Sequence, residues 1–216
     1  MKGKIAVYVG PTAFGLGTKP IKNPDPDRIV FLPPVKRGDL EMLDPAFTTI
    51  LIVDGYFHSV PAVGHAEIRD ALRRAEIIGC SSMGAIRAYE MRGLGMRGFG
   101  RIYEMFLEHE DFTDDEVALL HAPEPLYFPL SEPLVDLREL TRQLIEKRLL
   151  GANDGRSIVA ELREMYFGNR TLETYTGLLG QRLTEEEVNF AMGWLPHSRL
   201  KCFDFMAALS ALAEHQ

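Results

Sequence analysis

An alternation of strand-like and helix-like segments along the first hundred residues most constrains the fold of this chain. Short apolar runs end at glycine or proline, and amphipathic stretches follow the later runs. Strands are predicted at residues 5–10, 28–32, 48–57 and 76–80, and helices at about 61–75, with Ser59 and Pro61 as start signals, and 83–91. Strands that alternate with helices indicate an α/β fold with a mainly parallel sheet and flanking helices.

The pattern becomes helical from about residue 131. Helical stretches are predicted at residues 131–150, 154–167, 184–195 and 198–215. Thr184 and Glu187 stand at the spacing of a capping box, which marks a helix start. We therefore expect an α/β core over residues 1–130 and a helical C-terminal region, residues 131–216, packed on that core.

Composition narrows the classes of function. The 216 residues carry a formal net charge of −7, and the dense basic cluster at Arg69, Arg73 and Arg74 has the spacing of a solvated helix face. Because the basic stripe of a nucleic-acid-binding protein is missing, we expect no nucleic acid partner.

Cys80 and Cys202 are too few for a disulfide framework, and their apolar neighbours predict buried thiols. Neither a signal peptide nor a membrane span is evident, so we expect a cytoplasmic protein with no membrane partner.

Three polar or glycine-containing turns follow predicted strands. They are Gly10-Pro11-Thr12, Asp54-Gly55 and Ser81-Ser82. Ligands of parallel sheets bind beyond the carboxyl ends of the strands, where these three turns are expected to meet. The sequence therefore predicts a functional site at this edge.

Ser82 is the candidate nucleophile of this site. The stretch from Cys80 to Gly84 is a small-x-Ser-x-Gly version of the nucleophile elbow, a sharp strand-to-helix turn that exposes a serine. The N–H of Met83, at the helix start, would be one oxyanion donor, and Gly10 or Thr12 could supply another. A plain helix cap explains a serine at this corner equally well.

Two other site types have weaker support. Gly10 and Gly15 have the spacing of a phosphate-binding P-loop, but Leu16 stands where that loop needs lysine. Residues 110–121 gather acids and a histidine, as a hard-metal site would. A capping box from Thr113 to Glu116, or a surface for a partner protein, explains these acids better. We expect no metal and no cofactor.

The helices next to the predicted edge carry further candidates. His65 and Glu67 follow the Asp54 strand, and a lone histidine is either a structural residue or part of the site. Arg87 and Glu90 are three residues apart on the helix after Ser82 and can pair with each other. Alternatively, Arg87 faces the site and holds a carboxylate or the tail of a carrier protein.

The chain contains sequence blocks at Gly10-Pro11-Thr12 and at residues 33–40, 52–68, 81–104, 114–121 and 130–138. In this order, the blocks resemble the TfuA-like protein family. The resemblance implies a partner of YcaO enzymes, which activate a peptide amide with ATP in peptide backbone thioamidation. It implies hydrolysis of the thiocarboxylated tail of a ThiS-like, ubiquitin-fold sulfur carrier, which releases sulfide. It also implies help for YcaO in engaging its precursor peptide or protein substrate.

The resemblance further implies a serine–lysine active site in which Ser82 is the serine. The family's lysine falls on Ala66, within the stretch His65-Ala66-Glu67-Ile68, and alanine has no titratable group. A serine hydroxyl is a poor nucleophile at neutral pH without a base. Three explanations stay open: a deliberate lysine-to-alanine change, a natural variant that keeps only adaptor function, or His65 in the role of the base.

The resulting prediction is a Ser–Lys hydrolase that is impaired in this chain by Ala66. A non-catalytic adaptor that docks YcaO and the sulfur carrier is the alternative. The expected roles are nucleophile for Ser82, oxyanion donors for Met83, Thr12 and Gly10, and carrier binding for His65, Asp54, Arg87, Glu67 and Glu90.

Overall fold

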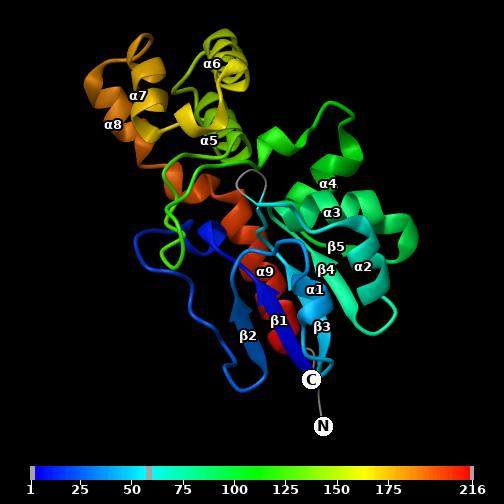
Figure 1. Cartoon of the computed structure of the whole chain (residues 1–216). Helices are drawn as coiled ribbons and strands as arrows, with labels where there is room; N and C mark the ends of the chain where they lie inside the picture. Colours follow the sequence, from blue (N-terminus) through cyan, green and yellow to red (C-terminus); the bar gives the residue numbers. More distant parts are fainter. Residues whose placement is uncertain (1–2, 57–59, 215–216) are drawn as a thin grey trace. The chain divides into compact units, whose positions relative to one another are not determined.

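The computed structural model of the chain describes residues 3–56 and 60–214. A five-stranded sheet with the order β2-β1-β3-β4-β5 lies in its first part (Figure 1). The strands are β1 (Lys4–Tyr8), β2 (Ile29–Leu32), β3 (Phe47–Ile52), β4 (Glu76–Gly79) and β5 (Arg97–Gly98). Neighbouring strands pair in parallel throughout, so their carboxyl ends share one edge of the sheet.

The helices follow the strands and then fill the second half of the chain. They are α1 (Asp39–Met42), α2 (His65–Ala71), α3 (Met83–Met91), α4 (Arg101–Glu108), α5 (Leu134–Glu146), α6 (Ala152–Glu164), α7 (Leu172–Gly180), α8 (Glu185–Met192) and α9 (Leu200–Glu214). Short 3-10 helices include η1 (Pro11–Phe14) and η3 (Asp114–Glu116). Among the described residues, no helix has both the length and the apolar character that a membrane span requires.

The chain forms two compact units. The first contains residues 1–114 and 201–216, and the second contains residues 115–200. Helix α9 therefore belongs to the unit that holds the sheet, although almost ninety residues separate it from the rest of that unit. The sequence prediction places a boundary between residues 130 and 131.

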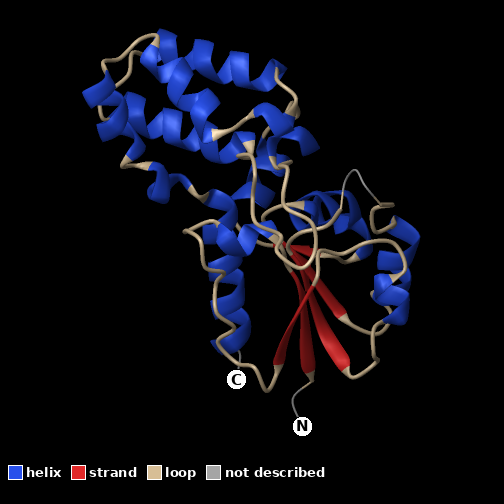
Figure 2. Cartoon of the chain, turned by 60° about the vertical axis from the view of Figure 1, so that its left-hand side comes forward, coloured by secondary structure: helices blue, strands red, loops and turns tan. Residues whose placement is uncertain are grey.

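The sheet of the first unit has helices on both sides (Figure 2), and an apolar layer lies on each of its faces. Successive strand residues point to opposite faces, so each buried strand supplies both layers. Ala6, Ile50 and Ile77 pack in the cluster that also contains residues of α1, α2 and α3. Val7, Leu51 and Ile78 pack in the cluster that contains Phe205, Ala208 and Leu209 of α9.

The second unit has an apolar core of its own. Helix α5 places Leu134, Leu137, Leu140 and Leu144 at helical spacing on one side, which is the amphipathic pattern of a core-facing helix. Side chains from the other helices complete the cluster, among them Ile158, Leu162, Tyr175, Leu179 and Val188.

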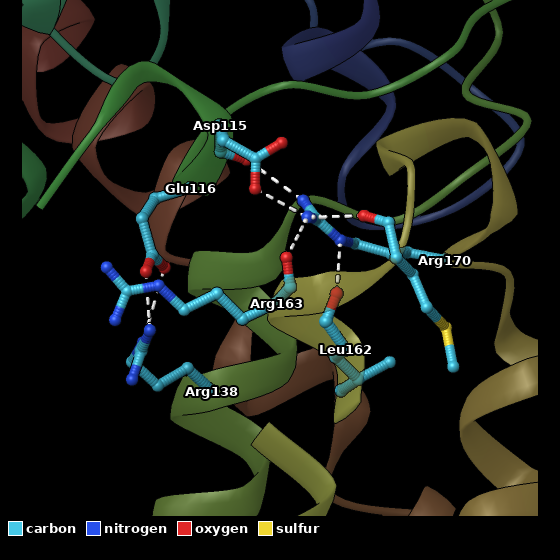
Figure 3. A network of polar contacts seen from close by, with 7 residues as sticks. Asp115, Glu116, Arg138, Leu162, Arg163 and Arg170 are labelled. Atoms are coloured by element: carbon cyan, nitrogen blue, oxygen red, sulfur yellow. Dashed lines mark hydrogen bonds and ion pairs between the residues drawn. The ribbon is translucent and has the colours of Figure 1, made fainter. Parts of the chain in front are cut away.

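Arg170 is the polar centre of the second unit (Figure 3). Its side chain is fully buried, and its guanidinium donates to the backbone oxygens of Leu162, Met165 and Asp115 at 2.9, 2.8 and 3.0 Å. The Asp115 carboxylate pairs with the same guanidinium. A buried cation is tolerated only when it is hydrogen-bonded and paired, as it is here.

The acids at residues 113–116 differ from their predicted role. Thr113 does not open an α-helix, because only the short η3 forms at Asp114–Glu116. Glu116 is buried and binds Arg138, beside the Arg170 network (Figure 3). Two of the acids that suggested a capping box are therefore ion-pair partners of arginines within the second unit.

The other predicted strands and helices are of the predicted type in the structure, but their first and last residues differ from the prediction. The α/β class and all four predicted strands are confirmed. The predicted helix at 61–75 starts only at His65, after Gly64, and Ser59 lies outside the described residues. The capping box at Thr184 and Glu187 is confirmed. Helices α1 and α4 and strand β5 were not predicted, because they are short and a glycine precedes each helix and ends the strand.

Candidate functional site

Asp54 anchors the turn after β1 to the end of β3. Its buried carboxylate accepts hydrogen bonds from Gly10 N and Thr12 N, both at 2.9 Å, and from the Thr12 hydroxyl at 2.6 Å. The two turns therefore meet at the carboxyl edge, as the sequence predicted. The same bonds engage the two backbone N–H groups that were candidates for an oxyanion hole, so Asp54 has a positioning role and these donors are occupied.

These contacts also bear on the P-loop alternative. A phosphate-binding loop directs its N–H groups at the ligand. Here the N–H groups of Gly10 and Thr12 bind a carboxylate of the protein, and the turn continues as the 3-10 helix η1. The occupied donors and the missing lysine at Leu16 disfavour nucleotide binding at this turn.

Ser81 and Ser82 form the corner between β4 and α3. Ser81 has a φ of 65°, in the left-handed region that is costly for a residue other than glycine. Its buried hydroxyl donates to the backbone oxygen of Lys201, in the first turn of α9, at 2.8 Å. The strained backbone is therefore held in place by a contact from a distant helix.

Close packing brings α3 against the strands at this corner. Gly84 N donates to Val53 O at 3.1 Å, and a Cβ at Gly84 would lie 1.8 Å from the backbone oxygen of Ile52. A Cβ at Gly79 would likewise lie 2.0 Å from Gly84 O. Only glycines permit this approach, which confirms the small residue predicted two positions after Ser82.

The Ser82 hydroxyl does not cap α3. Ser82 occupies the N-cap position, but its side chain accepts no hydrogen bond from the helix start, and its hydroxyl has no partner among the described residues. The residue is 3% exposed. A helix cap therefore does not explain this serine, and its hydroxyl is not engaged by another group of the described residues.

The N–H of Met83 is a suitable oxyanion donor. Met83 is the first residue of α3, where backbone N–H groups have no intrahelical acceptor. No hydrogen bond from this N–H occurs within the described part of the chain. It lies directly after Ser82, as the donor in a nucleophile elbow does, and it carries the positive end of the helix dipole.

His65, Arg87 and Glu90 form a second cluster. His65 Nε2 lies 2.8 Å from Glu90 Oε2, and Arg87 Nη1 donates to the same oxygen at 2.6 Å. Arg87 Nε also donates to Val63 O at 3.1 Å. Burial opposes ionisation of Glu90, but the hydrogen bonds from His65 and Arg87 outweigh it and lower the pKa of the carboxyl. The predicted pairing of Arg87 with Glu90 is thus present.

A pocket of about 380 Å³ extends along α3 from this cluster toward the serine corner. Met83, Ile86, Arg87 and Glu90 line it at the spacing of one helix face. Ala62 and the aromatic rings of Phe106 and Phe112 line it from other segments, with the two rings packed edge to face at 4.7 Å. Its lining thus includes Met83, the residue that follows Ser82.

The structure does not join His65 to Ser82. Glu90 lies eight residues beyond Ser82 on α3, which corresponds to about 12 Å along the helix axis. Because His65 is bound at the level of Glu90, it is poorly placed to take a proton from Ser82. Ala66, the next residue of α2, is exposed.

Glu67, a predicted carrier-binding residue, makes a contact within the protein. It is 7% exposed, and its carboxylate accepts a hydrogen bond from Leu40 N, at the start of α1, at 2.8 Å. It therefore ties α2 to α1 within the protein.

The cysteines and the acids provide no metal site. Within residues 3–56 and 60–214, no three His, Cys, Asp or Glu side chains are grouped so that they could hold a metal ion. Cys80 and Cys202 are both buried, as predicted, and burial raises the pKa of the Cys80 thiol. A buried neutral thiol is a packing residue and a poor metal ligand.

Sequence reasoning missed the contribution of α9 to this edge. The contact between Ser81 and Lys201 spans 120 positions in the sequence. The one available signal was a lysine inside the apolar stretch Leu200–Ala208, and that signal says nothing about which turn the helix contacts.

Comparison with protein families agrees with the resemblance seen in the sequence. The family model of the TfuA-like protein matches residues 54–171, which is just over half of the chain. The match includes Asp54, Ala66, Ser82 and Arg87, and it ends before α9. No curated protein matches the sequence. The chain belongs to the TfuA-like protein family.

Proposed function

We propose that this protein works with a YcaO enzyme in peptide backbone thioamidation and releases sulfide from a thiocarboxylated, ThiS-like carrier. Family membership supports the association with a YcaO partner. The observation that carries the hydrolase is Ser82, whose hydroxyl has no partner among the described residues and stands next to the available N–H of Met83. We place the reaction in the cytoplasm.

The reaction is an acyl transfer at the carrier's terminal carbon. Ser82 Oγ attacks the thiocarboxyl carbon, and the oxygen that becomes negative accepts a hydrogen bond from Met83 N–H. Collapse of this intermediate expels hydrosulfide and leaves an ester between Ser82 and the carrier. Water then hydrolyses the ester and returns the carrier as a carboxylate.

The pocket beside α3 supplies the binding part of the proposal. The thiocarboxylated tail of the carrier must enter as an extended, narrow segment to bring its last carbon to Ser82. Arg87 is the cation of this pocket, and its guanidinium is oriented by Glu90 and Val63. We propose that Arg87 contacts the tail, and that His65 and Glu90 hold the Arg87 side chain in place.

Position 66 limits the activity expected from this chain. Alanine cannot take the proton of Ser82, so the proposed hydrolase is impaired unless another residue supplies a base. The same substitution favours the second candidate function, an adaptor that docks YcaO and the carrier without chemistry of its own. Under that alternative, the carrier and the precursor peptide remain partners.

Sulfide release from a thiocarboxylated ThiS-like carrier tests the proposal. We expect the Ala66→Lys variant to release sulfide, because position 66 then carries an amine, and we expect Ala66→Lys with Ser82→Ala to release none. The two variants differ only at the nucleophile. If both are silent while a YcaO protein still binds them, the hydrolase is wrong and the adaptor is correct.

A further inference from the structure

A tight turn at Ser81 sets the backbone just before Ser82. The backbone N–H of Ser82 donates to Cys80 O at 2.8 Å, which closes a three-residue turn around Ser81, and the φ of Ser81 is 65°. A turn of this kind with a positive φ at its central residue is rare and strained. A glycine would adopt the same φ at no steric cost. A serine at this position therefore needs surrounding contacts that offset the strain.

The Ser81 hydroxyl makes such a contact with α9. The side chain is fully buried, and its hydroxyl donates to Lys201 O at 2.8 Å. The start of α9 is itself fixed, because the Asp204 carboxylate accepts the backbone N–H groups of Arg101 and Ile102, both at 2.8 Å. The turn before Ser82 is thus held by a helix that is bound in place.

The residues after Ser82 are fixed as well. A Cβ at Gly55 would lie 2.7 Å from the Met83 side chain, so Met83 packs closely against the turn after β3. The backbone N–H of Gly84 donates to Val53 O at 3.1 Å, just after the end of the same strand. Ser82 therefore lies between neighbours that are held on both sides, which is the arrangement that presents a reactive group precisely.

The backbone of Ser82 differs from that of the threonines that cap helices in this chain. Thr171 and Thr184 have ψ values of 164° and 162°, and their side chains accept backbone N–H groups of α7 and α8. Such an extended backbone is the usual one for an N-cap residue. Ser82 has a ψ of −120°, and within the described residues its side chain accepts no bond from the start of α3. The backbone conformation at this corner thus accompanies a hydroxyl that is not spent on the helix.

We propose that Ser81 is a positioning residue for Ser82. The hydrogen bond from the Ser81 hydroxyl to Lys201 O holds the strained turn, and the turn holds Ser82 in the conformation that leaves its hydroxyl uncapped, directly before Met83 N–H. The inference rests on the proposed function, in which this hydroxyl attacks the thiocarboxyl carbon. Ser81 is fully buried and bound to α9, so it acts through Ser82 and does not contact the carrier.

The test is the kinetics of sulfide release by Ala66→Lys, with and without Ser81→Gly. Glycine removes the hydroxyl and adopts a positive φ without strain, so the variant should fold and lose only the contact with α9. We expect kcat to fall by about tenfold or more, because a misplacement of about 1 Å can cost about 100-fold. The KM for the carrier should stay unchanged, because Arg87 and Glu90 of the proposed binding pocket are not altered.

Two further variants make the result specific. Ser81→Ala removes the hydroxyl but keeps a Cβ at the positive φ, so its kcat should fall at least as far as that of Ser81→Gly. Thr141→Val is the matched control, because the buried Thr141 hydroxyl donates to Leu137 O, also at 2.8 Å, within the second unit. This control should keep the kcat of Ala66→Lys. Either Ser81 variant decides the question, provided that its circular dichroism matches that of Ala66→Lys.

The outcomes separate this inference from the proposed function. A kcat of Ser81→Gly within about threefold of that of Ala66→Lys overturns the inference and leaves the hydrolase in place. A higher KM that accounts for the whole loss of kcat/KM also overturns it, because positioning acts on the bound carrier. An equal loss of kcat in Thr141→Val counts against it too, since any lost buried hydroxyl would then have the same effect. Silence of Ala66→Lys itself overturns the proposed function, and the inference with it.

Discussion

Thr184 and Ser82 are both helix N-cap residues, but their hydroxyl groups make different contacts. Thr184 accepts a hydrogen bond from Glu187 N, and its own N–H donates to the Glu187 carboxylate at 2.8 Å. Ser82 makes no corresponding contact at the start of α3. The difference separates a hydroxyl that stabilises the start of a helix, that of Thr184, from one that makes no contact there, that of Ser82.

The contrast gives a stability prediction for single substitutions. Thr184→Ala should lower the free energy of unfolding by about 1 kcal/mol, the usual cost of losing an N-cap. Ser82→Ala should lower it by less than about 0.5 kcal/mol, because no hydrogen bond is lost. Chemical denaturation of both variants beside the unmodified chain measures the two values. An equal loss in both would mean that Ser82 is a helix cap after all.

The sequence located some of these residues and could not locate others. The serine corner was predictable because strand, small residues and helix are consecutive in the chain. The roles of Gly10 and Thr12 were not predictable, because the carboxylate that occupies their N–H groups is more than forty residues away. Short-range patterns place a residue on an element, whereas its hydrogen-bond partner is decided by the packing of distant elements.

At the scale of elements, α9 ties together parts of the first unit that are distant in sequence. Its first turn contacts Ser81, and its Asp204 caps α4 by accepting the N–H groups of Arg101 and Ile102. Gly100, the N-cap residue of α4, has a φ of 92°, and a Cβ there would lie 2.3 Å from the Asp204 carboxyl carbon. The glycine that concealed α4 in the sequence is therefore what admits the capping carboxylate.

The Asp204 carboxyl should make the free energy of unfolding depend on pH. Burial raises the pKa of its carboxyl to about 6, against the hydrogen bonds from Ile102 and Arg101 that lower it. The unfolded chain has a value near 3.9. Between about pH 4 and pH 6 the folded state holds a proton that the unfolded state has lost. The contribution of Asp204 to the free energy of unfolding should therefore fall as pH rises through this window, by an amount on the order of 3 kcal/mol.

The measurement compares the unmodified chain with Asp204→Asn at several pH values from 4.5 to 7. Other carboxylates, such as Glu90 with its lowered pKa, contribute equally to both proteins and cancel in the difference. The unmodified chain should lose stability relative to the variant as pH rises. A difference that does not change with pH would show that the Asp204 carboxyl has an ordinary pKa.

At the scale of the whole molecule, the α/β class followed from the sequence because alternating strands and helices permit few architectures. The membership of α9 in the first unit did not follow, since periodicity predicts a helix but not the sheet against which it packs. The buried Arg170 of the second unit was equally unpredictable. Three of its acceptors are backbone oxygens, those of Leu162, Asp115 and Met165, and backbone oxygens leave no trace in the residue pattern.

We propose that Ser82 is a nucleophile toward the acyl carbon of a thiocarboxylated carrier. The most direct measurement is mass spectrometry of the protein after rapid acid quenching during sulfide release by Ala66→Lys. We expect a carrier-derived ester on the peptide that contains Ser82, and we expect it to be absent when Ser82→Ala is added. Sulfide release that continues in the Ser82→Ala background, with no adduct at residue 82, would contradict it.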